Sequence, residues 1–220
     1  MKRSYSLIAL FLIITIKSQS IRVDYDLVRN TTISTDKNFS NEFKDKILES
    51  EKKPEKYVLY FENGNSFFKS LPIKDINHEN APTKSGGTTT TIVETSVKQP
   101  VKVFKIKGED RYYGLQSDNG KDFYKISHTK FNSKNYKDEK QKIDKFMCSL
   151  VEINNPSGTI TKVWYTEDLP VSTGPFAYGD FPGLVLKVET PTFVMYTTKI
   201  SENINDGEFE KMDSKLPVVE

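Results

Sequence analysis

The chain has few residues that could act as a nucleophile or a base. Among its 220 residues it has one cysteine, Cys148, and two histidines, His78 and His128. A thiolate becomes a nucleophile when a histidine accepts its proton, and the two partners are neighbours in space rather than in sequence. Cys148 and His128 could therefore serve a hydrolase, although no local motif supports the pair. Phe146 and Leu150 flank Cys148, which favours a buried and unreactive thiol.

Candidate metal ligands are equally sparse. A structural zinc site needs four cysteine or histidine ligands, and the chain has three such residues. Calcium could bind Asp24 and Asp26, or Asp118, Asn119 and Asp122. The second group lies where a turn is expected, and Asp and Asn serve turns equally well. The sequence therefore predicts no catalytic residues, no metal site and no cofactor.

The most distinctive stretch runs from Val163 to Glu189 and holds the only tryptophan, three prolines and three glycines. Pro182-Gly183 fits the centre of a type II turn, and we expect a strand to follow from Leu184. We interpret the loop either as a buried corner that plugs a β-structure or as an exposed rim that contacts a ligand. The candidate rim residues are Trp164, Tyr165, Pro170, Gly174, Pro175, Phe176, Tyr178, Phe181, Pro182 and Gly183.

This stretch resembles the GLPGLI family of Bacteroidetes cell-envelope proteins. The name-giving hexapeptide reads Asp180-Phe181-Pro182-Gly183-Leu184-Val185 here, and Trp164-Tyr165-Thr166 and Gly174-Pro175 match its lead-in. The resemblance covers roughly Lys142 to Ile200. It implies a location in the cell envelope and a β-rich architecture, and the family has no agreed activity. Asp180 replaces a glycine of the family pattern. If the backbone there has positive φ, Asp180→Gly should keep or raise stability.

The first twenty residues have the pattern of an export signal. Lys2 and Arg3 precede an apolar segment from Leu7 to Ile16, and Ser18-Gln19-Ser20 fits a cleavage site. The apolar segment is shorter than the roughly 20 residues of a membrane span, although an uncleaved anchor is the alternative. We predict a signal peptide over residues 1–20 and a periplasmic or secreted protein of a Gram-negative cell envelope, membrane-associated only through partners.

Loss of the signal peptide would change the charge balance. The whole chain has a formal net charge of +2, and residues 1–20 carry three basic and no acidic side chains, so the remainder has +2 − 3 = −1. A nearly neutral chain lacks the basic surplus of nucleic-acid-binding proteins. We therefore predict no nucleic-acid partner.

The sequence predicts that residues 21–200 form one mainly β domain. Ile21, Val23, Tyr25 and Leu27 alternate with polar residues, as in a strand with one buried face. Asn63-Gly64 is a strong signal for a two-residue hairpin turn. The further expected strands are Tyr57–Phe61, Val101–Ile106, Arg111–Leu115, Asp122–Ser127, Phe146–Ile153, Thr159–Thr166, Leu184–Glu189 and Thr192–Ile200. Short consecutive strands predict an antiparallel meander that forms a curled sheet, a sandwich or a partly open barrel.

Three other segments complete the predicted organisation. Phe39, Phe43 and Ile47 recur at a helical spacing, which predicts one short helix that ends before Pro54. Residues 71–100 are polar and indicate a long mobile loop. Residues 201–220 indicate a weakly ordered tail.

The residues favour an exported, non-enzymatic protein that binds an apolar ligand or another envelope component through the aromatic rim. A curled sheet can hold an apolar molecule, although the same rings could fill its core. One alternative is a hydrolase that uses Cys148 and His128 or carboxylates brought together by folding. Another is a structural or assembly partner of an outer-membrane complex, with residues 71–100 as the contact. The oligomeric state is left open.

Overall fold

The computed structural model describes residues 20–30, 53–72, 81–82, 88–89, 100–128, 131 and 133–220. The predicted helix at Phe39–Ile47, residues 1–19 of the predicted signal peptide and most of the polar loop 71–100 lie outside these residues. The described part contains no helix. It accordingly offers no helical segment that could span a membrane.

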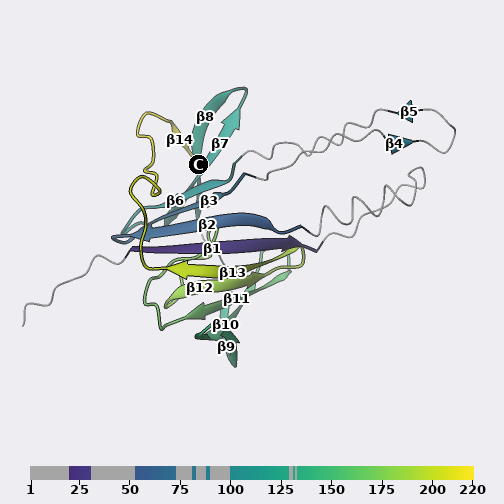
Figure 1. Cartoon of the computed structure of the whole chain (residues 1–220), viewed down its shortest axis with the longest axis vertical. Helices are drawn as coiled ribbons and strands as arrows, with labels where there is room; N and C mark the ends of the chain where they lie inside the picture. Colours follow the sequence, from purple (N-terminus) through teal and green to yellow (C-terminus); the bar gives the residue numbers. More distant parts are fainter. Residues whose placement is uncertain are drawn as a thin grey trace, which may run out of the picture.

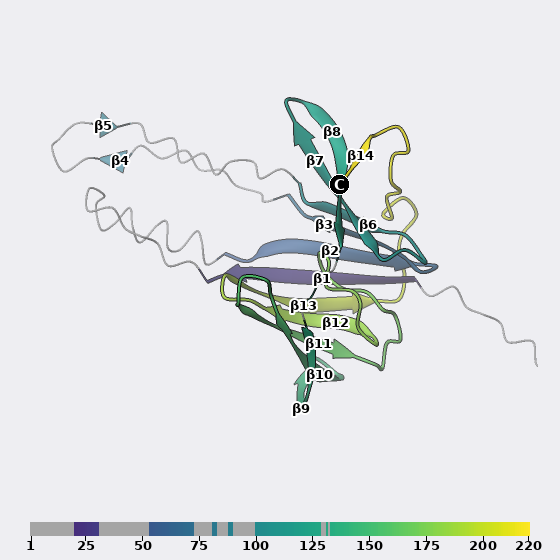
Figure 2. The same cartoon turned by 180° about the vertical axis from the view of Figure 1, so that it is seen from behind.

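Twelve strands form one sheet, which confirms the predicted mainly β fold (Figures 1 and 2). The order across the sheet is β14-β8-β7-β6-β3-β2-β1-β13-β12-β11-β10-β9. The strands are β1 (Ser20–Arg29), β2 (Glu55–Glu62), β3 (Asn65–Ser70), β6 (Lys102–Lys105), β7 (Arg111–Asp118), β8 (Lys121–His128), β9 (Ser133–Ile143), β10 (Phe146–Asn154), β11 (Ile160–Thr166), β12 (Leu184–Glu189), β13 (Phe193–Ser201) and β14 (Val218–Val219). A separate ribbon pairs β4 (Ala81–Pro82) with β5 (Thr88–Thr89).

The sheet consists of two antiparallel meanders that meet at its centre. One runs outward from β1 through β2, β3, β6 and β7 to β8, and the other from β13 through β12, β11 and β10 to β9. β1 and β13 join them as an antiparallel pair. The expected hairpin at Asn63-Gly64 is confirmed, since these residues have φ of 53° and 88°. Positive φ at both central residues is typical of a type I′ turn, whose twist matches that of the strands.

The chain connectivity requires the sheet to curl. β8 and β9 lie ten strand positions apart, which would be about 48 Å in a flat sheet at about 4.8 Å per strand. Only four residues separate His128 at the end of β8 from Ser133 at the start of β9. Such a connection spans at most about 18 Å. The linked ends of β8 and β9 therefore lie close together, although the two strands do not pair.

Three clusters of apolar side chains form the core. The central cluster contains Ile21, Val23, Tyr25, Leu27, Tyr57, Leu59, Phe68, Phe146, Cys148, Leu150, Trp164, Val171, Leu184, Leu186 and Met195. The second contains Val151, Ile153, Val163, Tyr165, Phe181, Val185 and Val188. The third contains Val58, Tyr60, Phe67, Phe104, Tyr113 and Tyr124. The alternation predicted for β1 is confirmed, because the four alternating residues Ile21, Val23, Tyr25 and Leu27 all lie in the central cluster.

The C-terminal segment, residues 202–220, covers the third cluster; we call it the C-terminal strap. We expected a weakly ordered tail here. Figure 1 shows the strap (yellow) leaving β13 and passing the ends of the neighbouring strands to reach β14. Ile204, Phe209, Met212 and Leu216 pack against the third cluster. β14 then pairs in parallel with β8.

Strand β9 was not predicted. Its sequence, SKNYKDEKQKI, has no apolar face, and most of its side chains are exposed. The strand pairs with β10, and Lys137 forms an ion pair with Glu152 on that neighbour at 2.9 Å. Hydrophobic alternation cannot reveal a strand that buries neither face.

Candidate functional site

The loop of residues 167–183 connects β11 to β12 through unusually tight turns. Three backbone hydrogen bonds join residues two positions apart, from Val171 N to Leu169 O, from Thr173 N to Val171 O and from Gly183 N to Phe181 O, at 2.7, 2.8 and 2.7 Å. The prediction of a type II turn at Pro182-Gly183 is wrong. Gly183 has φ of 158°, whereas that turn requires about 80°. The peptide folds instead as a three-residue γ-turn closed by the Gly183 amide.

At three glycines of the loop a Cβ atom would lie too close to a neighbouring atom, which is a backbone oxygen at two of them and a side-chain hydroxyl at the third. A Cβ atom at Gly183 would lie 1.9 Å from the carbonyl oxygen of Thr166, and one at Gly174 would lie 2.1 Å from that of Tyr178. A Cβ atom at Gly179 would lie 2.5 Å from the hydroxyl oxygen of Tyr112 on β7. The loop is therefore fixed against both meanders by close packing.

Most of the candidate rim residues are buried. Trp164 belongs to the central cluster with 7% of its surface exposed, and its indole N–H donates to Glu189 Oε1 at 2.8 Å. Phe181 belongs to the second cluster with 2% exposed. The others that are buried are Tyr165, Gly174, Pro175 and Gly183, while Pro170 and Pro182 are exposed. Trp164 and Phe181 are thus core side chains, in agreement with the buried-corner interpretation and not with an exposed rim.

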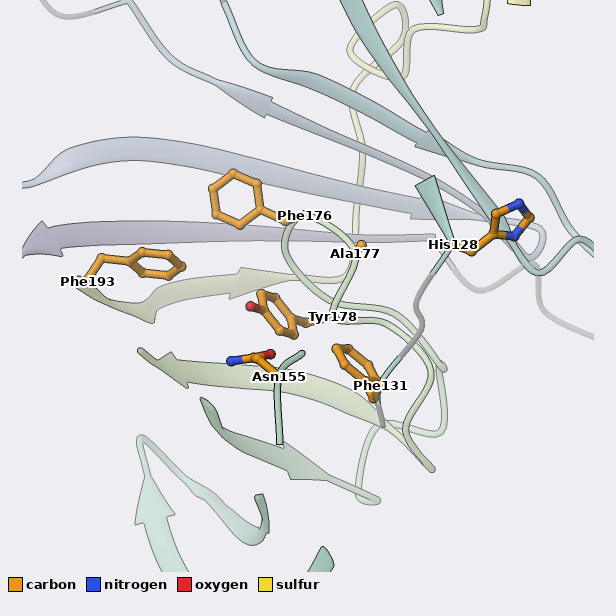
Figure 3. A pocket seen from close by; sticks show the side chains of 7 residues that line it. All are labelled: His128, Phe131, Asn155, Phe176, Ala177, Tyr178 and Phe193. Atoms are coloured by element: carbon orange, nitrogen blue, oxygen red, sulfur yellow. The ribbon is translucent and has the colours of Figure 1, made fainter. Parts of the chain in front are cut away.

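Phe176 and Tyr178 are half-buried and line a pocket (Figure 3). The pocket has a volume of about 370 Å³. Its lining residues are His128, Phe131, Asn155, Phe176, Ala177, Tyr178 and Phe193. They come from the end of β8, the β8–β9 connection, the β10–β11 turn, the 167–183 loop and the start of β13. The pocket therefore lies where the two ends of the curled sheet approach each other.

Phe176 adopts a backbone conformation that is unusual for its type. Its φ is 51°, in the left-handed region that costs a bulky residue about 1–3 kcal/mol. Three rings hold the side chain in place, with centroids 4.8 Å away at Phe68, 5.7 Å at Tyr57 and 6.0 Å at Phe193. Packing of the Phe176 ring against β2, β3 and β13 thus compensates the backbone strain and fixes the position of the ring beside the pocket.

Tyr178 lines the pocket together with Phe131. The two rings stack with centroids 5.9 Å apart and an interplanar angle of 10°. Burial raises the pKa of Tyr178, and a hydrogen bond with Thr161 partly opposes this effect. Asn155 also donates its amide to Thr161 Oγ1 at 2.9 Å. The pocket thus combines apolar walls with a small polar network at Asn155.

Asp180 has a different role from the one its sequence position indicated. It is not among the described residues with positive φ, so a glycine is not required there. Its carboxylate forms an ion pair with Lys105 on β6, and its backbone carbonyl accepts a hydrogen bond from Lys134 Nζ on β9 at 2.8 Å. We call Asp180, Lys105 and Lys134 the Asp180 clasp. The clasp connects the loop to both meanders.

The structure does not support a thiol nucleophile at Cys148. The side chain is fully buried in the central cluster, whereas His128 is exposed at the end of β8. Burial, with a contribution from the Asp168 carboxylate, raises the pKa of the Cys148 thiol to about 11. A thiol with this pKa stays protonated at neutral pH and does not act as a nucleophile. Within the described ranges, no group of three or more His, Cys, Asp or Glu side chains could hold a metal ion.

The calcium candidates have other partners or roles. Asp24 pairs with Arg22 at 3.0 Å and Asp26 with Lys56 at 2.6 Å. Asn119 has φ of 50° and forms the β7–β8 turn with Gly120. These residues therefore serve the fold.

Sequence reasoning missed most of the pocket. Phe131, Asn155, Ala177 and Phe193 were not candidates, and His128 was considered only as a base. Asn155 lies in the β10–β11 turn, between the predicted strands Phe146–Ile153 and Thr159–Thr166. No local signal connects that turn to Phe176, because only the curl of the sheet brings them together.

A family model described as "Protein of unknown function (Porph_ging)" matches residues 105–187. The matched region runs from β6 to β12 and includes the 167–183 loop and most residues of the pocket. This description does not carry the GLPGLI name that the hexapeptide suggests. No curated protein matches the chain.

Two crystal structures of PNGF-II, in space groups C2 and P21, have a similar fold. Both have a TM-score of 0.51 and 14% identity, and the match covers 90% of this chain but only 29% and 30% of theirs. The chain thus spans less than a third of the length of PNGF-II. An uncharacterised conserved protein from Thermus thermophilus matches with a TM-score of 0.37 and 7% identity, over 92% of this chain and 91% of its own. The central part of the chain is therefore similar to a family of unknown function, and these matches do not indicate an activity.

Proposed function

We propose that this protein binds an apolar group of a ligand or of another envelope component in the pocket beside the 167–183 loop, without catalysing a reaction. The observation that carries the proposal is the pocket itself. Its volume of about 370 Å³ falls within the roughly 300–1,000 Å³ of small-molecule sites. Phe131, Phe176, Tyr178 and Phe193 supply apolar walls, and Asn155 supplies a polar group that could orient a ligand.

The rigidity of the loop supports binding by a preformed site. The three close-packed glycines and the Asp180 clasp fix the backbone that carries Phe176 and Tyr178. A preformed site loses little conformational entropy when its ligand binds, so more of the contact energy contributes to affinity. The left-handed Phe176 agrees with this proposal, since strained residues cluster at ligand sites.

Native mass spectrometry of protein purified from its own cells tests the proposal. We expect a bound small molecule or partner to be retained by the wild type and lost from Phe176→Ala and Tyr178→Ala. Met147→Ala is the matched control, because Met147 is an apolar side chain on β10, 53% exposed, that does not line the pocket. Retention by the pocket variants, or no bound mass and no binding of small aromatic compounds, would refute the proposed site.

We also propose that the protein is an exported cell-envelope protein of the GLPGLI type. The basic start, the apolar segment from Leu7 to Ile16 and the hexapeptide at 180–185 support this address. Cell fractionation with mass determination of the N-terminus tests it. We expect a species that begins near Ile21 in the periplasmic, surface or secreted fraction. A full-length chain confined to the cytoplasm would contradict the proposal.

A further inference from the structure

Strand β9 presents a long unpaired edge. It has 11 residues and pairs with β10 on one side, and no described strand pairs with its other side. The other end of the sheet differs, because β14 covers β8 at Tyr124 and Lys125. An open strand edge carries unpaired N–H and C=O groups that can accept a further strand.

The open edge begins at the pocket. Ser133, the first residue of β9, pairs with Asn154, whose side-chain amide donates to Ser133 Oγ at 2.8 Å. The next residue, Asn155, lines the pocket, and so does Phe131, two residues before β9. A segment that paired with the free edge of β9 and continued past Ser133 would therefore approach Phe131, which lines the pocket.

The side chains of β9 determine what kind of segment could pair with this edge. The strand carries four lysines against two acidic residues, Asp138 and Glu139. Lys134 and Lys137 have partners within the chain, whereas Lys140 and Lys142 are exposed. Edge lysines discourage indiscriminate pairing, because a neighbouring strand must accommodate their charge. An acidic segment would do so, since opposite charges across a strand pair are stabilising.

We infer that an extended acidic segment of a partner protein adds to the free edge of β9 and inserts one large apolar side chain into the pocket. In such strand addition, main-chain hydrogen bonds supply affinity and a side-chain pocket supplies specificity. The inference rests on the proposed function of the pocket and names its partner. A second copy of this chain fits less well, because two β9 edges would oppose each other with an excess of positive charge on both.

Selection from a displayed library of random peptides of about ten residues tests the inference. We expect enriched peptides to alternate acidic with apolar residues around one aromatic residue. Binding should weaken about tenfold or more in the double variant Lys140→Glu/Lys142→Glu and in Phe176→Ala. The control Met147→Ala should bind like the wild type. Hydrogen exchange should show new protection of the β9 amides.

N-methylation of alternate peptide bonds in a selected peptide gives a readout that does not depend on how the variants fold. Methylation removes backbone donors and should abolish binding if the peptide adds as a strand. Undiminished binding of the methylated peptide would overturn the inference. Selected peptides that lack acidic residues and leave the β9 amides unprotected would overturn it as well.

Small aromatic compounds separate failure of the inference from failure of the proposed function. If indole or phenol binds in a Phe176-dependent manner and no peptide is enriched, the pocket function stands and strand addition fails. If neither binds, both fail. Sedimentation gives the oligomeric state of the wild type and of the double variant Lys140→Glu/Lys142→Glu. If the wild type is a dimer and the double variant is a monomer, the edge binds a second copy of the chain and the inference is overturned.

Discussion

The 167–183 loop and the C-terminal strap both cover apolar faces of the same sheet, and they are held there in different ways. The loop buries its backbone so closely that a Cβ atom at Gly183 would lie 1.9 Å from Thr166 O. The strap is held by four apolar side chains on the third cluster and by ion pairs of partly exposed side chains, such as Arg22 with Glu208 at 2.7 Å and Lys69 with Glu210 at 3.0 Å. At Gly207 in the strap a Cβ atom would meet nothing within 4 Å.

This difference shows how one sheet combines a fixed segment with an adjustable one. Steric fit tolerates almost no change, because interiors are close-packed and a displaced atom displaces its neighbours. Half-exposed ion pairs contribute little each and depend on salt and pH. The loop is therefore suited to hold a binding site, and the strap is suited to tolerate variation.

The largest expected effect comes from adding one carbon atom to the loop. Gly183→Ala should destabilise the protein by about 3 kcal/mol or more, because the new atom would overlap the Thr166 carbonyl. Gly207→Ala is the control in the strap and should cost only about 1 kcal/mol, for its left-handed φ of 83°. Urea unfolding measures both. Equal losses would remove the contrast between the two segments.

Breaking the Asp180 clasp should have a smaller effect. Asp180→Gly should lower stability by about 1 kcal/mol, because the ion pair with Lys105 is lost and no left-handed strain is relieved. Asp144→Gly is the matched control, since Asp144 has φ of 53° and glycine should keep or raise stability there. Melting temperatures compare the two variants. A gain in stability from Asp180→Gly would restore the interpretation drawn from the family pattern.

Two truncations at Phe176 isolate the strain in the loop. Where φ is negative, a variant with alanine is more stable than the same protein with glycine by roughly 0.5–1 kcal/mol. Because Phe176 has φ of 51°, Phe176→Gly should be the more stable of the pair, by about 1 kcal/mol. At Phe209 in the strap, which is not among the positive-φ residues, we expect the ordinary order. Calorimetry of the four variants tests this reversal.

The smallest effect is a pH dependence of the strap. Burial opposes ionisation of Glu210, but hydrogen bonds from Lys102 and Lys69 outweigh it and hold the pKa of Glu210 below its usual value. The folded state therefore binds protons less readily than the unfolded state. The ionised Glu210 carboxylate stabilises the folded state fully above the unfolded pKa of about 4.3. This contribution is lost as pH falls through the lower folded pKa.

Methyl NMR distinguishes the strap from the core during this titration. As pH falls below about 4, the Met212 methyl signal should shift before that of Met195, which is fully buried in the central cluster. Glu210→Gln should loosen the strap and flatten the pH dependence. A simultaneous shift of both methyl groups would mean that strap and core respond as one unit.

Local patterns predicted the strands that bury one face and the turns between them. The alternation of Ile21, Val23, Tyr25 and Leu27 and the Asn63-Gly64 hairpin follow from short-range rules that tertiary context did not override. The charged strand β9 escaped prediction because it buries neither face. The sequence therefore indicated the type of sheet but not its edge.

The pocket could be predicted only in part. Phe176 and Tyr178 were candidates because they lie in a loop rich in proline and glycine, and both line the pocket. Trp164 and Phe181 come from the same stretch, yet they point into the core. Which ring of such a loop faces outward depends on its γ-turns and on contacts with distant strands, and neither leaves a local pattern.

The pairing of β1 with β13 has a consequence for how the chain reaches its native state. The contacts that join the meanders have large sequence separations, 160 residues between Tyr25 and Val185 and 182 between Ser20 and Glu202. Closing such long loops is entropically expensive, so proteins rich in distant contacts fold slowly. During synthesis β1 must wait for nearly the whole chain to emerge before β13 can pair with it. Until then its apolar face needs protection from other chains, and a slow refolding phase should report the closing of this central pair.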